Sequence, residues 1–281
     1  MTTRLPIPAT IVRIAPESDD TATFTLRPHR DAPTFDCARP GQFAMLSLYG
    51  AGAAAFTLSS LPRGGGPAGD VVLTIRRVGR LTTRLFCLGP GAAVGLSGPF
   101  GHGFPDDDPG CPTIYAAGGC GLSPLKAAID VHLAERPAGT KVAIVYGARD
   151  PSTRIHRAAL AHWRTLPAVT VIETVDHGGG DWPGRLGTTA AHIAEAVAAI
   201  GARRAALCGP PAMLATTSRC LAAAGLPATG IHLAIERHME CGTGHCGHCY
   251  VNHRLVCTDG PVFTLAELRM LPDARREVGA P

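Results

Sequence analysis

The amino-acid sequence predicts an N-terminal antiparallel Greek-key β-barrel, then an α/β domain with a doubly wound parallel sheet, then a small cysteine-rich module. Three observations indicate this fold class. Short β-type segments fill the first hundred residues, strand-type and helix-type segments alternate from Cys111 onward, and four cysteines lie between residues 241 and 257. A chain of 281 residues is long enough for two domains with separate cores and one small module.

The barrel is predicted from six short segments rich in Val, Ile, Thr, Phe and Leu, with glycine and proline clusters between them. Their spacing is typical of an antiparallel barrel. The segments are residues 9–16, 21–28, 42–49, 54–60, 70–78 and 92–100. The stretch 98–109 holds too much glycine, proline and aspartate to continue a strand or a helix, so we place the domain boundary in it and assign residues 1–105 to the barrel.

The second domain is predicted from the alternation of apolar strands with helices. The predicted strands are residues 111–119, 141–149 and 170–176, the predicted helices are 120–136, 154–166 and 187–200, and residues 204–225 contain one of each. Such alternation favours an open parallel sheet with right-handed crossovers. We assign residues 106–234 to this domain.

The cysteine-rich module, residues 235–281, has the spacing C-x4-C-x2-C-x7-C. Its four cysteines are Cys241, Cys246, Cys249 and Cys257. A plant-type [2Fe-2S] cluster takes two thiolates per iron from a C-x4-C-x2-C loop and one more distant cysteine. Gly242, Gly244 and Gly247 fit a loop that wraps a cluster, because glycine adopts positive φ without strain.

Zinc is the competing interpretation of the same four cysteines. Four-thiolate zinc sites are more often built from two separate C-x2-C pairs, and this segment has only one. His245 and His248 could replace two cysteines in a Rieske-type site, but four thiols are already present, so we expect both imidazoles to lie beside the cluster or in solvent.

Composition and charge indicate which cellular compartment and which class of binding partner to expect. The net charge of +4 is modest and the arginines are dispersed, which disfavours nucleic acid as a partner. No apolar run is long enough to span a bilayer, and the N-terminus reads as the start of a strand rather than a signal peptide. We therefore expect a cytoplasmic protein, in which most of the other cysteines are small buried apolar residues: Cys37, Cys87, Cys111, Cys120, Cys208 and Cys220.

A glycine-rich turn, Gly118 to Gly121, follows the first strand of the second domain and opens a helix. Backbone N–H groups and the helix dipole at such a turn can receive a dinucleotide pyrophosphate. The turn is not a GxGxxG motif, and a simple tight turn would also explain it. The segment Cys208-Gly209-Pro210 ends a later parallel strand, so we expect it at the same carboxyl edge of the sheet, where ligands bind.

Five segments together resemble the ferredoxin–NADP reductase superfamily: AGGCGLSPL, VYGARD, ETVD, LCGPPAM and IERHMECGTGHCGHC. Within it the chain is most similar to flavin-containing electron-transfer subunits. These are the gamma (diaphorase) subunit of cytoplasmic NAD(P)-linked [NiFe] hydrogenases (sulfhydrogenases), the B subunit of anaerobic sulfite reductase and the electron-transfer subunit of dihydroorotate dehydrogenase. The similarity extends from about Ile11 to Val262, and the ERHMECGTGHCGHC string is closest to the hydrogenase type.

The resemblance implies an FAD site on the barrel. Phe56, Thr57, Leu58 and Ser59 occupy the place of the family's flavin-binding strand motif, and Val78, Gly79, Thr82 and Thr83 that of its second phosphate-binding loop. The family motif begins with an arginine, but Ala54 stands at that position here. The negative charge of the phosphates must then be balanced by backbone N–H groups, hydroxyls and Arg80. Plain strand and turn remain the alternative for both segments.

The resemblance also implies an NAD(P) site in the second domain. Its members are Gly118, Gly119, Gly121 and Pro124 at the pyrophosphate, Gly147 and Arg149 at the adenosine half, Asp176 near the ribose, and Cys208, Gly209 and Pro210 at the nicotinamide. A guanidinium such as that of Arg149 can pair with a 2′-phosphate, which favours NADP slightly, but an arginine at a strand end is equally often a solvated surface residue. The choice between NAD and NADP stays open.

No nucleophile with a base and an orienting acid is recognisable, so we assign no catalytic residue and expect the cofactors to carry the chemistry. Glu236 and Glu240 flank basic residues and are expected to be solvated or capping groups. The resemblance implies an electron relay from NAD(P)H through FAD and a [2Fe-2S] cluster to an iron–sulfur subunit and a [NiFe] hydrogenase subunit. Dihydroorotate dehydrogenase and sulfite reductase are alternative partners, and a zinc-stabilised regulatory binding module is the alternative from another class. Residues 262–281 are expected to form a short helix that covers the cluster or meets the partner.

Overall fold

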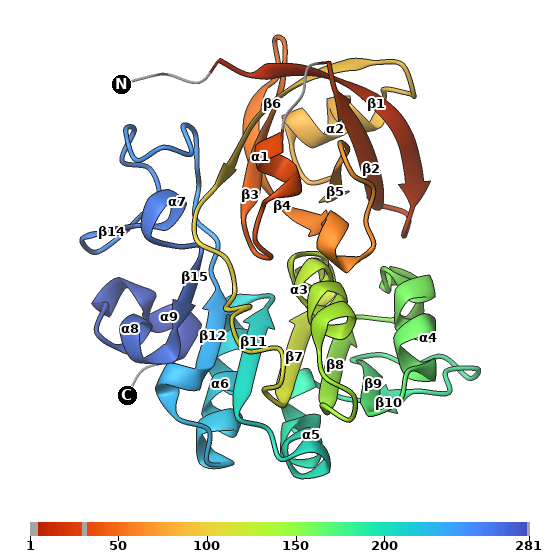
Figure 1. Ribbon diagram of the computed structural model, residues 1–281, viewed down its shortest axis with the longest axis vertical. Coiled ribbons are helices and arrows are strands. Elements are labelled where there is room, and N and C mark those ends of the chain that lie inside the picture. Colours follow the sequence, from red (N-terminus) through yellow and green to blue (C-terminus); the bar gives the residue numbers. More distant parts are fainter. Residues whose placement is uncertain (1–4, 30–32, 280–281) are drawn as a thin grey trace.

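The computed structural model describes residues 5–29 and 33–279 and places two domains and a lateral module side by side (Figure 1). Six strands form a closed antiparallel barrel in the order β1-β2-β5-β4-β3-β6, a Greek-key connection. Their bounds are β1 Ile7–Pro16, β2 Thr21–Pro28, β3 Phe43–Leu48, β4 Gly52–Ser60, β5 Val71–Arg76 and β6 Ala93–Phe100. The strand period is clear in β2, where Phe24 and Leu26 fill the barrel while Thr23 and Thr25 face outward.

Two helices interrupt the strands of this domain, which the strand-only prediction missed: α1 (Pro33–Asp36) and α2 (Arg80–Phe86). Helix α2 carries Leu81 and Leu85 one turn apart, and both are buried in the barrel core. The hydroxyl of Thr82 accepts the N–H groups of Val78 and Gly79 and so caps the helix. Helix α2 therefore belongs to the barrel core.

The second domain is a seven-stranded sheet of order β10-β9-β8-β7-β11-β12-β15, parallel except at its β12–β15 edge. Helices α3 and α4 cover one face, where Tyr115 and Ala117 point, and α5 and α6 cover the other, where Ile114 and Ala116 point. The predicted doubly wound sheet is confirmed. The strands are β7 Thr113–Gly118, β8 Val142–Ala148, β9 Val169–Val175, β10 Arg185–Leu186, β11 Arg204–Cys208, β12 Ile231–Ala234 and β15 Val262–Thr264; the helices are α3 Leu122–Glu135, α4 Arg157–Thr165, α5 Ile193–Ile200 and α6 Pro211–Ala223.

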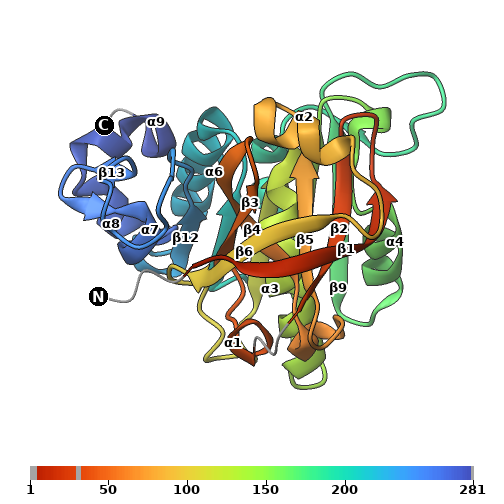
Figure 2. The same cartoon turned by 90° about the horizontal axis from the view of Figure 1, so that it is seen from above.

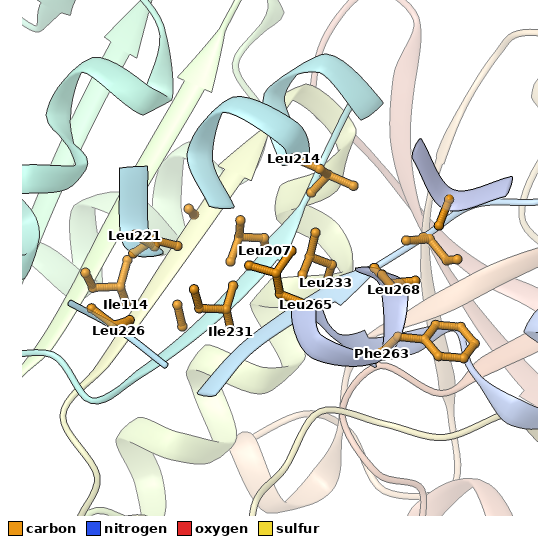
Figure 3. Close-up of a cluster of buried hydrophobic side chains, with 14 of the residues drawn as sticks. Ile114, Leu207, Leu214, Leu221, Leu226, Ile231, Leu233, Phe263, Leu265 and Leu268 are labelled. Carbon is orange, nitrogen blue, oxygen red and sulfur yellow. The ribbon is translucent and has the colours of Figure 1, made fainter. Parts of the chain in front are cut away.

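The segment after the cysteines differs from the single short helix that was expected. It begins with β15, which adds an antiparallel strand to the sheet, and continues with α8 (Leu265–Arg269) and α9 (Arg275–Val278). Figure 3 shows Leu265 and Leu268 beside core residues of β11, β12 and α6, and Phe263 belongs to the same buried cluster. This segment thus completes the core of the nucleotide-binding domain.

The cysteine-rich module is an insertion between β12 and β15. It contains a two-stranded ribbon, β13 (Tyr250–Val251) with β14 (Arg254–Leu255), and the short helix α7 (Val256–Asp259). Figures 1 and 2 place this module at one side of the molecule and α4 at the opposite side.

The two domains are joined by residues 101–112, between β6 and β7, and this segment contains the predicted boundary at 105/106. Asp106 forms ion pairs with Arg39 (2.6 Å) and Arg63 (2.7 Å), and Arg63 also pairs with Glu135 of α3 (2.8 Å). Helix α3 lies between the barrel and the sheet (Figure 1). Within residues 5–29 and 33–279, no helix is long and apolar enough to cross a membrane.

Candidate functional site

A cavity of about 430 Å³ opens between the barrel and the carboxyl edge of the parallel sheet. Six of the residues predicted for the nucleotide site line it: Gly118, Gly119, Gly147, Arg149, Asp176 and Pro210. Ligands of doubly wound sheets bind at this edge. The structure therefore brings together groups that lie far apart in the sequence.

In the turn after β7, close packing and backbone conformation both require glycine. A Cβ atom on Gly121 would collide with the carbonyl oxygen of Cys208, and one on Gly118 would lie 2.5 Å from the sulfur of Met213. Gly119 has φ +53°, a conformation that other residues rarely adopt. Gly121, Pro124, Cys208 and Gly209 are not among the residues that line the cavity. Gly121 and Cys208 instead hold the turn against the end of β11.

The turn from Gly118 to Cys120 lines this cavity and leads into α3. No side chain caps the helix, because its capping position is Gly121, and the N–H of Leu122 donates to the carbonyls of Gly119 and Cys120. The dipole of this 14-residue helix favours a bound phosphate at the turn.

Several lining residues were not predicted from the sequence. Thr188 and Thr189 come from the segment after β10, whereas Thr21, Asp20 and Arg76 come from the barrel, and the last two form an ion pair (2.6 Å). Barrel residues at a nucleotide cavity carry no local sequence signal, because only the packing of the two domains brings them there.

The predicted flavin-binding strand divides into buried and accessible residues. Leu58 lies in the barrel core and the hydroxyl of Ser59 donates to the carbonyl of Val72 (3.1 Å), so both are structural. Phe56 and Thr57 are half-buried, and the Thr57 hydroxyl makes no hydrogen bond to another residue in the described part of the chain. Phe56 and Thr57 are thus the members of this segment that remain able to contact a ligand.

In the predicted phosphate loop at the start of α2, some hydrogen-bonding groups already bond to one another. Thr82 is buried and bonds its own loop, whereas Thr83 is exposed and a Cβ on Gly79 would meet open space. Two guanidinium groups approach from the same helix. Arg84 donates to the carbonyl of Gly50 (3.0 Å) and Arg80 reaches that of Ala51 (3.5 Å).

These two contacts bear on the arginine that the family motif has at position 54. The residues that Arg80 and Arg84 reach lie in the β3–β4 turn, just before Ala54. Helix α2 therefore supplies positive charge close to the place where the strand motif lacks it.

Backbone N–H groups of the cysteine-rich loop point at sulfur. Those of Thr243 and His245 donate to Cys241 Sγ (3.4 and 3.3 Å), and that of Gly244 donates to Cys257 Sγ (3.2 Å). Gly242, Gly244 and Gly247 have φ of +71°, +80° and +74°. Amide donors to thiolate sulfur tune and stabilise iron–sulfur clusters, so the loop fits such a group.

The thiols differ in burial and protonation. Cys249 and Cys257 are buried, and burial, with the neighbouring Cys249 thiol, raises the pKa of Cys257. Burial alone would also raise the pKa of Cys241, but N–H groups of the loop stabilise its thiolate and lower the pKa to about 6. Across the described residues, no three His, Cys, Asp or Glu side chains lie close enough together to hold one metal ion.

The cysteine-rich loop packs directly on the barrel. A Cβ on Gly242 would lie 2.9 Å from the ring of Phe100 and 3.1 Å from Met45. Met45 lies on β3, and its cross-strand partner on β4 is Ala55, two residues from Thr57. One strand therefore separates the cysteine loop from the predicted flavin-binding strand.

Charged groups around the loop lie as expected. His245 and His248 are exposed, as predicted, and Glu240 lies between His238 (3.3 Å) and His248 (3.6 Å). Glu236, which follows β12, is also exposed, in agreement with the expectation of a solvated group, and its carboxyl group lies near the thiols of Cys208 and Cys120.

The other cysteines only partly match the prediction of burial. Cys111 and Cys208 are buried, but Cys37 and Cys87 are exposed, because each lies at the end of a short helix on the barrel surface. The prediction is wrong for these two.

Comparison with known proteins finds matches to two domain families. Residues 116–219 match the oxidoreductase NAD-binding domain, and residues 236–269 match the iron–sulfur cluster binding domain of dihydroorotate dehydrogenase B. The second match contains all four cysteines of the module.

Similar chains include two archaeal subunits and one solved structure. The chain is 32% identical over 242 residues to sulfhydrogenase 1 subunit gamma of Pyrococcus furiosus, covering 83% of this chain and 82% of that one. It is 31% identical over 266 residues to the probable dihydroorotate dehydrogenase B (NAD(+)) electron transfer subunit of Methanopyrus kandleri, covering 94% and 92%. Its fold is similar to a structure of an NADH-dependent reduced ferredoxin–NADP oxidoreductase, with a TM-score of 0.75, 20% identity and 96% coverage of both chains.

Proposed function

This chain belongs to the ferredoxin–NADP reductase-like family of iron–sulfur electron-transfer subunits, and from that premise we propose that it relays electrons between NAD(P)(H) and a partner protein through FAD and then a [2Fe-2S] cluster. One observation carries the order of the carriers. The nucleotide cavity opens against the barrel, and the cysteine loop packs on the barrel strand next to β4. The barrel thus lies between the entry and the exit of the electrons.

FAD, when bound, supplies the exchange between the two-electron chemistry of nicotinamide and the one-electron chemistry of the cluster. We assign its contacts to Phe56 and Thr57 on β4 and to Gly79 and Thr83 at the start of α2. The guanidinium groups of Arg80 and Arg84 then balance the phosphate charge in place of the missing arginine.

The dinucleotide is assigned to the 430 Å³ cavity. Gly118 and Gly119, with the N-terminus of α3, hold the pyrophosphate. Arg149 and Asp176 meet the adenosine ribose, and Pro210 lies towards the nicotinamide. The guanidinium of Arg149 attracts a 2′-phosphate, while the carboxylate of Asp176 suits a free 2′-hydroxyl, so these two residues together set the cofactor preference.

The four cysteines Cys241, Cys246, Cys249 and Cys257 are assigned to the cluster. The family match over residues 236–269 favours iron–sulfur over zinc, and the three N–H groups that donate to their sulfurs suit metal-bound thiolates. A regulatory zinc module would use neither the nucleotide cavity nor the contact between the loop and the barrel.

The partner is assigned from the relatives. We propose a hetero-oligomeric complex with an iron–sulfur subunit and a [NiFe] hydrogenase subunit, since the sulfhydrogenase gamma subunit is 32% identical over most of both chains. The match to the iron–sulfur domain of dihydroorotate dehydrogenase B favours a dihydroorotate dehydrogenase catalytic subunit as the second candidate.

Purification of the full chain under anaerobic conditions tests the relay. We expect a yellow-brown protein that contains FAD, iron and sulfide and in which NADH or NADPH bleaches both the flavin and the cluster absorption. A colourless preparation with stoichiometric zinc would overturn the proposal. Affinity purification of the tagged chain from its host, followed by assays for hydrogen-dependent and dihydroorotate-dependent NAD(P) reduction, distinguishes the two partners.

A further inference from the structure

A buried polar cluster crosses the seam between the barrel and the nucleotide-binding domain. Its centre is His156, which precedes α4 with φ +53° and whose side chain is only 4% exposed. Its main-chain N–H donates to Glu17 Oε2 (2.7 Å), and its ring Nδ1 lies 3.4 Å from Glu17 Oε1. Glu17 follows β1, so this pair joins the two domains directly.

The second ring nitrogen of His156 extends the cluster. Its Nε2 lies 3.2 Å from the hydroxyl of Ser123 and 3.4 Å from that of Thr74, and Thr23 donates to Glu17 (2.8 Å). Burial alone would raise the pKa of Glu17, but the hydrogen bonds and charge of His156, with the Thr23 hydroxyl, lower it to about 2. Glu17 is therefore an ionised carboxylate held by partners from both domains.

The polar cluster of Glu17 and His156 connects the glycine turn at the nucleotide cavity with the barrel, and these two parts of the molecule must be aligned. Ser123 lies in the first turn of α3, directly after the glycine turn at the nucleotide cavity. Thr74 lies on β5, four residues before the loop assigned to the flavin phosphates. On the outward face of β2, Thr21 lines the nucleotide cavity, whereas Thr23 and Thr25 line a second cleft of about 300 Å³ whose wall also contains the Glu17–His156 pair.

We propose that Glu17 and His156 are positioning residues for hydride transfer, because they fix the dinucleotide-binding turn at one distance from the flavin-binding barrel. The inference rests on the proposed function. In the reaction a hydride, one proton with two electrons, leaves NAD(P)H, which becomes NAD(P)⁺, and reduces the flavin. Neither residue is assigned a contact with the reacting atoms. A displacement of about 1 Å between two reacting groups slows such a step by about 100-fold.

The variants are chosen to preserve folding. His156→Asn keeps the main-chain bond to Glu17 and suits positive φ, since asparagine adopts the left-handed conformation readily, but its short side chain cannot reach Ser123 or Thr74. Glu17→Ala removes the carboxylate altogether. His162→Gln is the matched control, because His162 is exposed on α4, the helix that His156 precedes.

In anaerobic stopped-flow experiments on the FAD-loaded chain, we expect both variants to slow flavin reduction by NADH or NADPH about 10- to 100-fold while the nucleotide dissociation constant changes less than about threefold. The long-wavelength charge-transfer absorption of the nicotinamide–flavin pair should weaken in both variants and stay unchanged in the control. Unchanged reduction rates, or a loss confined to the dissociation constant, would overturn the proposal.

Hydrogen exchange of the protein without flavin gives an independent readout. Glu17→Ala should speed exchange of the His156 amide and of the first turn of α3, while His162→Gln leaves both protected. Equal protection in Glu17→Ala and wild type would also overturn the proposal. If the wild-type chain reduces no flavin with either nucleotide, the proposed function is contradicted instead. The exchange experiment still decides whether the polar cluster of Glu17 and His156 couples the two domains.

Discussion

The contact between the cysteine loop and the barrel leads to a sharp prediction for Gly242→Ala. Gly242 has φ +71°, and its new Cβ would lie 2.9 Å from Phe100 and 3.1 Å from Met45. The backbone conformation costs about 1–2 kcal/mol for a residue other than glycine, and overpacking adds about 1–3 kcal/mol. The loop can avoid this second cost by moving away from the barrel.

Gly244→Ala is the matched control for this experiment. Gly244 has φ +80° in the same loop, so its alanine variant carries a similar backbone cost. The three atoms nearest to its Cβ would belong to Thr258 (3.1 Å) and Leu255, which are part of the cysteine-rich module itself. The difference between the two variants therefore isolates the contact between the loop and the barrel.

The assay separates two steps after anaerobic mixing with NADH or NADPH, in preparations whose iron and sulfide content has been matched. Reduction of the flavin should proceed as in wild type in both variants. Subsequent reduction of the cluster, followed by its visible absorption and electron paramagnetic resonance, should slow several-fold in Gly242→Ala and much less in Gly244→Ala. Equal rates of cluster reduction in the two variants would refute the reasoning, and so would a slower first step in Gly242→Ala.

Four further predictions follow from the site. Replacing Cys249 by Ser should abolish electron transfer to the partner and leave flavin reduction by NAD(P)H largely intact, measured with a partner-dependent and a flavin assay; loss of both contradicts the order of carriers. Arg149→Ala should raise KM for NADPH more than for NADH, because only the former has a 2′-phosphate, and an equal change in both shows that the guanidinium does not meet the ribose. The double variant Arg80→Ala, Arg84→Ala should bind FAD at least tenfold more weakly, about 1.4 kcal/mol or more, in a fluorescence titration, and unchanged affinity would place the phosphates elsewhere. Glu17 has a pKa of about 2 in the folded protein against 4.5 when unperturbed, so its carboxylate stabilises the fold above pH 4.5 and loses this contribution as the pH falls towards 2. The difference in urea-unfolding free energy between wild type and Glu17→Gln should therefore shrink over that range.

Local patterns in the sequence were sufficient for most of the fold. Alternation along β2, which places Phe24 inside and Thr23 outside, predicts a barrel strand, and the glycine turn from Gly118 predicts the change from strand to helix. Helix α2 was missed because its apolar positions, Leu81 and Leu85, are too few for a periodic signal.

Site residues could be predicted where they form a local sequence motif. They could not be predicted where they meet only through packing of elements far apart in the chain. The cysteine spacing indicated the cluster, and the comparisons confirm the family. The approach of Arg80 to the β3–β4 turn, and of Thr21 and Arg76 to the nucleotide cavity, depends on the docking of elements far apart in the chain. No local propensity encodes such contacts.

The insertion of the cysteine-rich module between β12 and β15 has a consequence for biogenesis. Because β15 and Leu265 follow the cysteines in the chain and complete the sheet and its core, the nucleotide-binding domain cannot finish folding during synthesis until the cluster loop has been made. Assembly of the metal centre and pairing of β15 with the sheet are then expected at the same stage of folding. Metal starvation is expected to reach beyond electron transfer and to lower the cellular abundance of the whole chain.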